Sequence, residues 1–229
     1  MQSSRLTRQC EKLSVPLFEV PARPVEAKDL WFESSRQAMR PELLVLARVR
    51  EEDEVGSWCE GGTLNLLMKA AAFPMLARYN TFKDPVDARR RYLEAQCEVL
   101  RRRKRALVQA VLEAETTVVL RAAEEILADA FIAEWYPRVT LQVMEALWRA
   151  LGADRLSQLF SRFMEAPYDY RSGWPDLVLV RGVNLRFIEV KTTDLLHKSQ
   201  LRIIENFLKP FNLDFSVAQV TSAVSETDG

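Results

Sequence analysis

Residues 173–180 read Gly-Trp-Pro-Asp-Leu-Val-Leu-Val, and residues 187–191 read Phe-Ile-Glu-Val-Lys. Each stretch contains a short apolar run, which is typical of a strand buried on both faces. The brief connection between the two runs contains a glycine and an asparagine, so the sequence predicts an antiparallel hairpin. Asp176 stands at the start of the first strand, and Glu189 and Lys191 stand at the end of the second.

This hairpin predicts a site for phosphodiester hydrolysis. Side chains alternate along a strand, so Glu189 and Lys191 point to the same side. Asp176, Glu189 and the backbone carbonyl of Val190 could hold a hard divalent cation, which prefers oxygen ligands. Lys191 could then orient or help deprotonate a water, or stabilise the charge of the transition state. The alternative is that Glu189 and Lys191 are exposed charges and Asp176 caps a turn.

Composition narrows the possible chemistry. The chain has 229 residues with 48% hydrophobic and 28% charged residues, which suits one globular domain or a domain with an added lobe. A single histidine, His197, makes Ser-His-Asp hydrolysis and multi-histidine metal sites poor candidates. Any metal should therefore be Mg²⁺ or Mn²⁺ held by oxygen. The absence of an apolar signal-peptide core or spanning segment, and three scattered cysteines, predict a cytoplasmic protein without membrane insertion.

The charge of the chain neither requires nor excludes DNA as a partner. Lys and Arg total 32 and Asp and Glu total 32, so the formal net charge is zero, whereas nucleic-acid binders usually carry a basic surplus. Basic residues are concentrated in residues 86–109, and the balance reverses in residues 113–134. The basic segment is either a DNA-facing stripe or one side of a helical pair neutralised by salt bridges.

The pattern along the chain predicts four segments. Residues 1–25 have three prolines and are expected to form an extended arm. Residues 26–166 are expected to be mainly helical, with a helix over 26–39 and one or two long helices over 85–133. Residues 167–220 contain the hairpin and form the expected catalytic core. Residues 221–229 are polar and are expected to be a flexible tail.

The segment GWPDLVLV…LRFIEVK…HKSQ resembles the virus-type replication-repair nuclease (VRR-NUC) domain of the PD-(D/E)xK superfamily. Asp176, Glu189, Lys191 and Gln200 occupy the positions of that family's catalytic pattern. The resemblance implies an α/β fold with a restriction-endonuclease-like core, a small mixed sheet flanked by helices. It also implies that the rest of the chain is a large helical N-terminal or inserted lobe.

The resemblance extends to the nuclease part of Fanconi-associated nucleases. Cys59-Glu60-Gly61-Gly62-Thr63 is similar to the segment that opens a helix and supplies another metal-binding glutamate there. Glu60 is thereby implied as a further ligand of Mg²⁺ or Mn²⁺. Its alternative role is that of a carboxylate favoured by a helix N-terminus. Residues 192–196 depart from the family pattern, because they are one residue short and lack an arginine, so the family's substrate contacts are not carried over to this segment.

Other side chains are candidates for DNA binding. His197 and Lys198 begin the helix after the second strand, where they contact phosphate or simply start a solvated helix. Trp174 either stacks on a base or sugar or packs internally. The remaining tryptophans are assigned to the core: Trp31, Trp58, Trp135 and Trp148.

These observations predict a Mg²⁺- or Mn²⁺-dependent DNA endonuclease. The favoured setting is an antibacterial toxin effector, with a cognate immunity protein as partner and delivery into a target cell without a classical signal peptide. The alternative is a stand-alone DNA repair or replication nuclease. A third hypothesis is a non-catalytic nucleic-acid-binding protein that keeps a nuclease fold.

Overall fold

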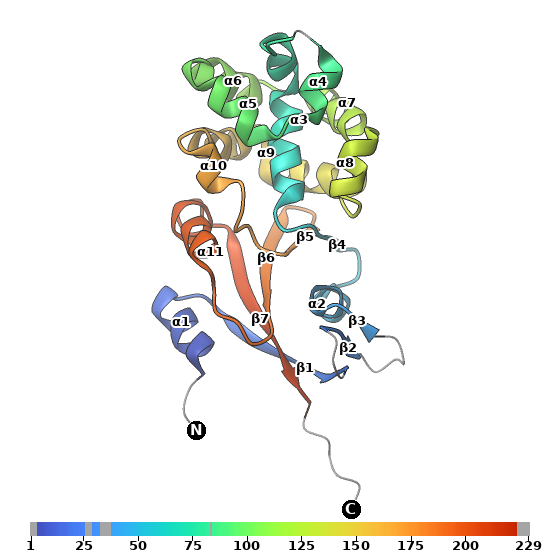
Figure 1. The fold of residues 1–229 in the computed structure, drawn as a ribbon, viewed down its shortest axis with the longest axis vertical. Coiled ribbons are helices and arrows are strands. Elements are labelled where there is room, and N and C mark those ends of the chain that lie inside the picture. The colour runs from blue at the N-terminus through green and yellow to red at the C-terminus, as the bar shows by residue number, and fades with distance from the viewer. Residues whose placement is uncertain (1–3, 26–28, 33–37, 83, 224–229) are drawn as a thin grey trace, which may run out of the picture.

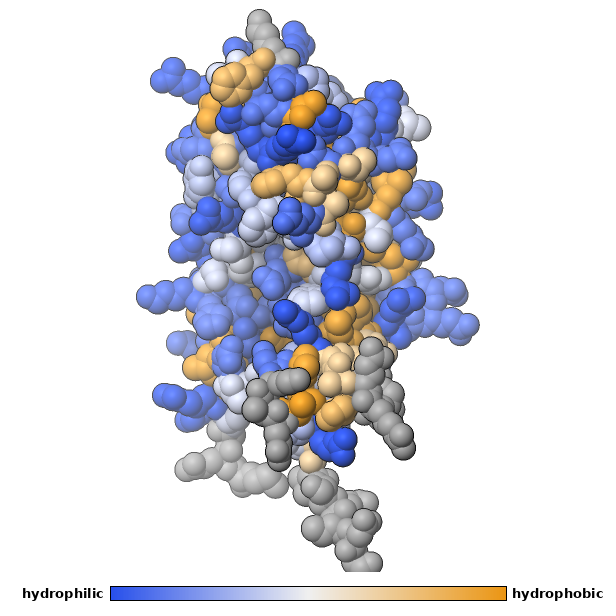
Figure 2. Space-filling view, turned by 45° about the vertical axis from the view of Figure 1, so that its right-hand side comes forward, coloured by the Kyte–Doolittle hydropathy of each residue, from blue (hydrophilic) through white to orange (hydrophobic). Residues whose placement is uncertain are grey.

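The computed structural model of the chain describes residues 4–25, 29–32, 38–82 and 84–223. Figure 1 shows an elongated molecule in which a sheet occupies one half and a group of helices the other. Figure 2 shows small apolar patches between hydrophilic side chains on one face of this molecule. The described strands form one seven-stranded sheet in the order β3-β2-β1-β7-β6-β5-β4. The protein is therefore an α/β protein with a mixed sheet.

Strands far apart in the chain meet at the centre of the sheet. β1, β7 and β6 are parallel neighbours, and all other neighbouring pairs are antiparallel. The strands are β1 (Leu17–Pro24), β2 (Trp31–Phe32), β3 (Ala38–Met39), β4 (Val55–Trp58), β5 (Leu177–Arg181), β6 (Asn184–Lys191) and β7 (Asp214–Ser222).

The predicted hairpin is confirmed. β5 and β6 pair antiparallel with Leu177 opposite Ile188, and Gly182 adopts a φ of 60° in the turn between them. β7 returns parallel to β6 after α11 (Lys198–Ile203) and a π-helical turn (Ile204–Leu208). β6 is therefore an internal strand with neighbours on both sides, which explains its almost continuous burial.

Most helices pack around α3 (Gly62–Arg78), which buries residues on all sides of its axis. The expected one or two long helices over 85–133 are wrong. Side chains of Asp84 and Asp129 cap new helices there, because each accepts a hydrogen bond from a backbone N–H two residues later. The remaining elements are α4 (Pro85–Arg90), α5 (Leu93–Val99), a 3₁₀ turn (Arg101–Arg103), α6 (Lys104–Leu112), α7 (Thr116–Leu127), α8 (Ala130–Trp135), α9 (Leu141–Phe163) and α10 (Pro167–Tyr170).

The basic segment is partly neutralised by ion pairs. The side chain of Arg90 lies 3.1 Å from that of Asp129, the N-cap residue of α8, and Lys104 lies 3.5 Å from Glu165. Local pairs along the chain add to this, namely Arg91 with Asp87 and Arg101 with Glu98. These contacts favour mutual neutralisation for the arginines concerned over a continuous DNA-facing stripe.

The N-terminal segment belongs to the folded body. Where an extended arm was expected over 1–25, the structure has α1 (Arg5–Leu13) and β1, and β1 pairs with β7 with Leu17 opposite Val217. The helix expected over 26–39 is wrong in its described parts, which form β2 and β3. Thr221 and Ser222 still belong to β7, and the expected tail beyond residue 223 lies outside the described residues.

Two apolar cores cover the two faces of the sheet. The larger joins the helical half and α1 to one face, and the smaller packs α2 (Pro41–Val49) on the other. Along β6, Phe187 faces the larger core, whereas Ile188 and Val190 face the smaller one. The period of two therefore turns Glu189 and Lys191 towards the helical side of the sheet. No described helix is long and apolar enough to cross a membrane.

Candidate active site

Glu189 lies at the centre of a buried polar cluster. Its side chain is 2% exposed and that of Lys191 is 6% exposed, and Lys191 Nζ lies 2.9 Å from Glu189 Oε1. The same oxygen accepts a hydrogen bond from Gln200 Nε2 of α11. Gln200 Oε1 in turn accepts the backbone N–H of His197 at 2.8 Å. Gln200 therefore ties the start of α11 to the carboxylate, and both rotamers are held by their partners.

Asp176 reaches the same cluster from the start of β5. Its Oδ2 accepts a hydrogen bond from the backbone N–H of Val190 at 2.8 Å. The N–H and C=O of one residue in a strand point to the same side, so the Val190 carbonyl also faces the Asp176 side of β6. The backbone carbonyl of Asp176 accepts from the N–H of Cys59 at 3.1 Å, which brings the end of β4 beside it.

Burial makes both carboxyl groups of this cluster difficult to ionise. Burial raises the pKa of Glu189 to about 8, and the neighbouring Asp176 raises it too, against the opposing effect of Lys191. Burial likewise raises the pKa of Asp176 to about 6, although the N–H of Val190 lowers it. One ammonium therefore does not compensate this group of carboxylates, and a further cation would stabilise their charged form.

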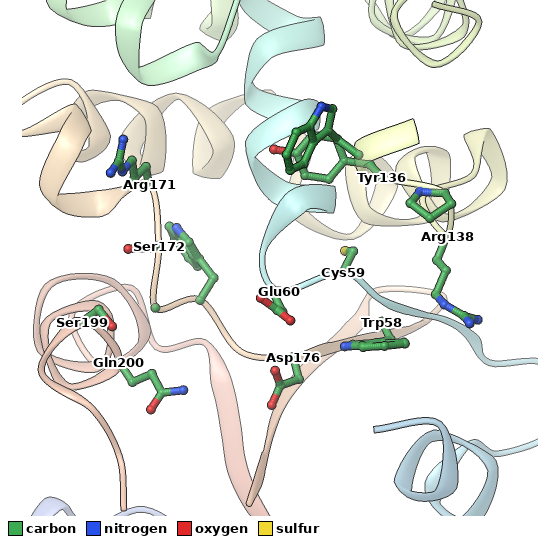
Figure 3. A pocket seen from close by; sticks show the side chains of 14 residues that line it. Trp58, Cys59, Glu60, Tyr136, Arg138, Arg171, Ser172, Asp176, Ser199 and Gln200 are labelled. Atoms are coloured by element: carbon green, nitrogen blue, oxygen red, sulfur yellow. The ribbon is translucent and has the colours of Figure 1, made fainter. Parts of the chain in front are cut away.

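Glu60 lies beside this cluster in a tight turn. It is exposed, with a φ of 47°, and Gly61 follows with a φ of 82° before α3 begins. A Cβ at Gly61 would lie 2.2 Å from the Cβ of Trp174, so only glycine permits this approach. In Figure 3, Glu60, Asp176 and Gln200 line one cavity, whose volume is about 580 Å³.

The donor set fits a hard divalent cation in part. Asp176, Glu189 and the Val190 carbonyl supply oxygen atoms on one side of the hairpin, and hard cations prefer such ligands. Within the described ranges, however, no three His, Cys, Asp or Glu side chains come together closely enough to hold a metal. Glu60 thus shares the cavity with Asp176 without joining a close cluster of three carboxylates.

Glu42 is an acidic neighbour that the sequence did not reveal. It lies in the first turn of α2, and its negative charge raises the pKa of Asp176 more than that of Glu60 does. Burial raises the pKa of Glu42 itself, and its Oε2 is buried with no hydrogen-bond partner among the described residues. Nothing in the local sequence indicates this role, because a glutamate after a helix-starting proline is common on solvated helices.

Trp174 does not present a ring to a ligand. It is 2% exposed, its Nε1 donates to the Tyr170 carbonyl at 2.8 Å, and its ring packs 4.8 Å from that of Phe207. Of the two roles considered for Trp174, its burial supports internal packing and is incompatible with stacking on a base. His197 and Lys198 are both exposed beside the cavity wall formed by Ser199 and Gln200.

The N-terminal helix holds the loop that follows Lys191. Gln9 of α1 donates through Nε2 to the Leu196 carbonyl at 3.1 Å, and its Oε1 accepts the Leu196 N–H at 2.8 Å. The side-chain amide thus pairs with the backbone as a neighbouring strand would. This contact anchors the unusual segment 192–196 on its way from β6 to α11.

The hairpin, the helix that carries Gln200 and the carboxylate cluster can be compared with known protein families. Residues 117–222 match the family model of the VRR-NUC domain, which confirms the resemblance inferred from the motifs. No curated protein matches the chain in sequence.

The fold is similar to that of paFAN1. In a crystal structure of paFAN1 bound to DNA with a 2-nucleotide 5′ flap and a gap, the similarity covers 98% of this chain and 44% of paFAN1, with 19% identity and a TM-score of 0.64. The complex of paFAN1 with 1-nucleotide 5′ flap DNA with a gap gives 21% identity, 95% and 42% coverage and a TM-score of 0.61. The chain thus spans less than half of the length of paFAN1, and the likeness extends through nearly all of its own fold.

Proposed function

We propose that this protein is a divalent-metal-dependent DNA nuclease with a PD-(D/E)xK core. The observation that carries the proposal is the buried Glu189 carboxylate, which Lys191 and Gln200 contact and Asp176 approaches from the neighbouring strand. The VRR-NUC match includes all four residues. The DNA in the paFAN1 complexes supports DNA as the substrate.

The residues divide the work according to their positions. Asp176, Glu189 and the Val190 carbonyl would hold Mg²⁺ or Mn²⁺, with Glu60 as a more distant ligand reached directly or through water. The cation would polarise the phosphoryl oxygens and lower the pKa of the attacking water. Lys191 would donate a hydrogen bond to that water or to the developing charge. Gln200 would keep Glu189 in its position, because its amide joins that carboxylate to the start of α11.

The proposal also includes a division of the chain into a catalytic core and a helical lobe. Residues 167–220 would form the catalytic core and residues 26–166 a mainly helical lobe. Strands β1, β2, β3 and β4 complete the sheet from outside 167–220, so the core would draw on the N-terminal segment as well. His197 and Lys198, both exposed at the start of α11, would contact phosphate groups beside the cavity.

A cleavage assay tests the activity. Purified protein is incubated with plasmid and with labelled linear DNA in Mg²⁺ or Mn²⁺, and compared with Asp176→Ala and Lys191→Ala. We expect cutting by the wild type only with metal present, and none by either variant. Lys209→Ala, which truncates an exposed lysine on another part of the surface, should cut like the wild type. A folded wild type that cuts no DNA with either metal would support the non-catalytic binding protein instead.

Expression tests the biological setting. The antibacterial effector predicted from the sequence should stop growth of a bacterial host, and a cognate immunity protein should restore it. Asp176→Ala should abolish the toxicity. Normal growth with high levels of active enzyme would instead favour the repair or replication nuclease. The same experiment, run with the protein retained in the cytoplasm or exported, identifies the compartment in which it acts.

A further inference from the structure

Three aromatic side chains lie in a row on the surface of the helical half. Tyr92 precedes α5, and Phe131 and Trp135 belong to α8. The ring centroids of Tyr92 and Phe131 are 6.1 Å apart, and those of Phe131 and Trp135 are 6.3 Å apart. Tyr92 is 41% exposed and Trp135 is 61% exposed, so the assignment of Trp135 to the core is wrong. We call Tyr92, Phe131 and Trp135 the aromatic row.

The aromatic row follows two adjoining cavities. Trp135 lines the cavity that contains Asp176 and Glu60, and Tyr92 lines a second cavity of about 400 Å³. Tyr136, Arg171 and Ser172 line both cavities, so the two adjoin each other. Figure 3 shows Tyr136 and Arg171 at the side of the first cavity away from Asp176. The row therefore marks a path that ends at the proposed active site.

The charges along this path are mostly compensated. Arg91 bonds Asp87 at 2.5 Å, and the guanidinium of Arg171 lies 3.9 Å from the carboxylate of Glu94. Buried Lys69 donates hydrogen bonds to the backbone carbonyls of Arg89 and Arg91, so its ammonium stabilises the fold. Arg138, which also lines the first cavity, is exposed and its guanidinium lies 5.0 Å from the ring centroid of Trp58. Most of the cations along the path are thus already engaged by other groups of the protein. The exposed faces of the aromatic rings therefore offer more for ligand binding than the cations do.

Exposed ring faces beside a path to a phosphodiester-cleaving site suit unpaired bases. Each base of a single strand offers a face for stacking, whereas in a duplex the neighbouring bases cover those faces. A guanidinium near the rings, such as that of Arg171 over the exposed ring of Tyr168 at 5.7 Å, adds cation–π contacts without requiring a particular sequence. A single strand on the row could place its next phosphates in the cavity beside Asp176.

We infer that the aromatic row binds unpaired nucleotides of a single-stranded segment of the substrate and guides that strand into the carboxylate cavity. The inference rests on the proposed nuclease function, whose substrate it narrows to DNA with an unpaired strand. It places Trp135 nearest to the scissile phosphate and Tyr92 farther along the same strand. Stacking makes the contact tolerant of sequence.

Binding without turnover tests the inference. Fluorescence anisotropy in EDTA compares a labelled oligothymidine of about twelve nucleotides with a duplex of the same length. We expect Trp135→Ala to weaken single-strand binding about tenfold, in line with the loss of one stacked base. Tyr92→Ala should have a smaller effect of the same kind, and Trp135→Phe should keep most of the affinity. Duplex binding should change less than about twofold in all three variants, because no base face is available.

The control is Val183→Ala, which truncates a 79% exposed side chain in the β5–β6 turn and should bind both DNAs like the wild type. Thermal melting confirms that each variant is folded. Single-strand affinity that stays unchanged in folded Trp135→Ala, or that falls equally with duplex affinity, overturns the inference and leaves the row to a protein partner. A wild type that binds the single strand through the row but cuts no DNA sinks only the proposed activity.

Discussion

The two ends of the proposed path are built in different ways. At the carboxylate end, Asp176, Glu189 and Lys191 come from one hairpin, are largely removed from water and contact each other. At the aromatic end, Tyr92 immediately precedes α5 and Trp135 ends α8, and both expose large parts of their rings. The β-strands fix the positions of the carboxylates and the lysine relative to each other. The aromatic surface, which would adapt to a flexible DNA strand, is instead formed at short helices.

The largest expected effect comes from removing one carboxylate, which should abolish cleavage and leave single-strand binding unchanged. Asp176→Asn keeps the shape of the side chain but removes the negative charge, so we expect DNA cleavage to fall by about a thousandfold or more. Calorimetric titration with Mn²⁺ should show a matching loss of metal affinity. Binding of single-stranded DNA to the aromatic row in EDTA should remain within about twofold. Cleavage within tenfold of the wild type would show that Asp176 does not hold the metal.

The pH dependence of stability in the metal-free protein should reveal the raised pKa of Glu189 at the carboxylate end. Glu189 has a folded-state pKa raised to about 8 from an ordinary value of 4.5, so folding favours its protonated form. Its contribution to stability is therefore complete below 4.5 and is lost as the pH rises towards 8. Urea unfolding in EDTA should show a loss of roughly a few kcal/mol across this window.

Glu189→Gln is the matched variant for that measurement. The amide does not titrate, so its stability should change much less between about pH 5 and about pH 8. Added Mg²⁺ should protect the wild type at the higher pH, because a cation stabilises the charged carboxylate. Parallel pH profiles for the two proteins would show that Glu189 does not carry the shift.

The turn at Gly61 connects the carboxylate end to the helical half. Gly61→Ala must place its Cβ 2.2 Å from Trp174 and adopt a positive φ, whereas a Cβ at Gly152 meets no atom within 4 Å at a φ of 68°. We expect Gly152→Ala to cost roughly 1–3 kcal/mol of unfolding free energy from backbone strain alone. Gly61→Ala should cost roughly 1–3 kcal/mol more through overpacking. Equal losses in urea unfolding would mean that Trp174 moves aside without cost.

The smallest effect is expected at Gln9. Gln9→Ala removes two hydrogen bonds to the backbone of Leu196 and leaves that part-buried N–H and carbonyl without their partner. We expect a loss of about 1–2 kcal/mol in stability and a several-fold drop in cleavage, because the loop before α11 positions Gln200. Gln158→Ala, which loses only an exposed contact with Asp154, should change neither measurement. Full activity in Gln9→Ala would limit the role of α1 to packing.

The local part of the site was accessible from sequence. The hairpin follows from two apolar runs and a short turn, and the facing of Glu189 and Lys191 follows from the period of a strand. Gln200 was placed by its motif, and the structure brings it to Glu189. The turn with Glu60 was also located correctly, although its carboxylate lies beside the close cluster instead of inside it.

The sequence alone thus determined which residues meet at the carboxylate end, because Asp176, Glu189 and Lys191 are neighbours in the chain or on paired strands. Tertiary structure decided the rest. β1 pairs with a strand from the opposite end of the chain, and Glu42 approaches Asp176 from a helix on another part of the chain. Only packing decided which tryptophan is buried, since Trp174 fits against Gly61 and Phe207 while Trp135 is left on the surface. Long-range contacts of this kind depend on shape complementarity, which no local pattern of residues records.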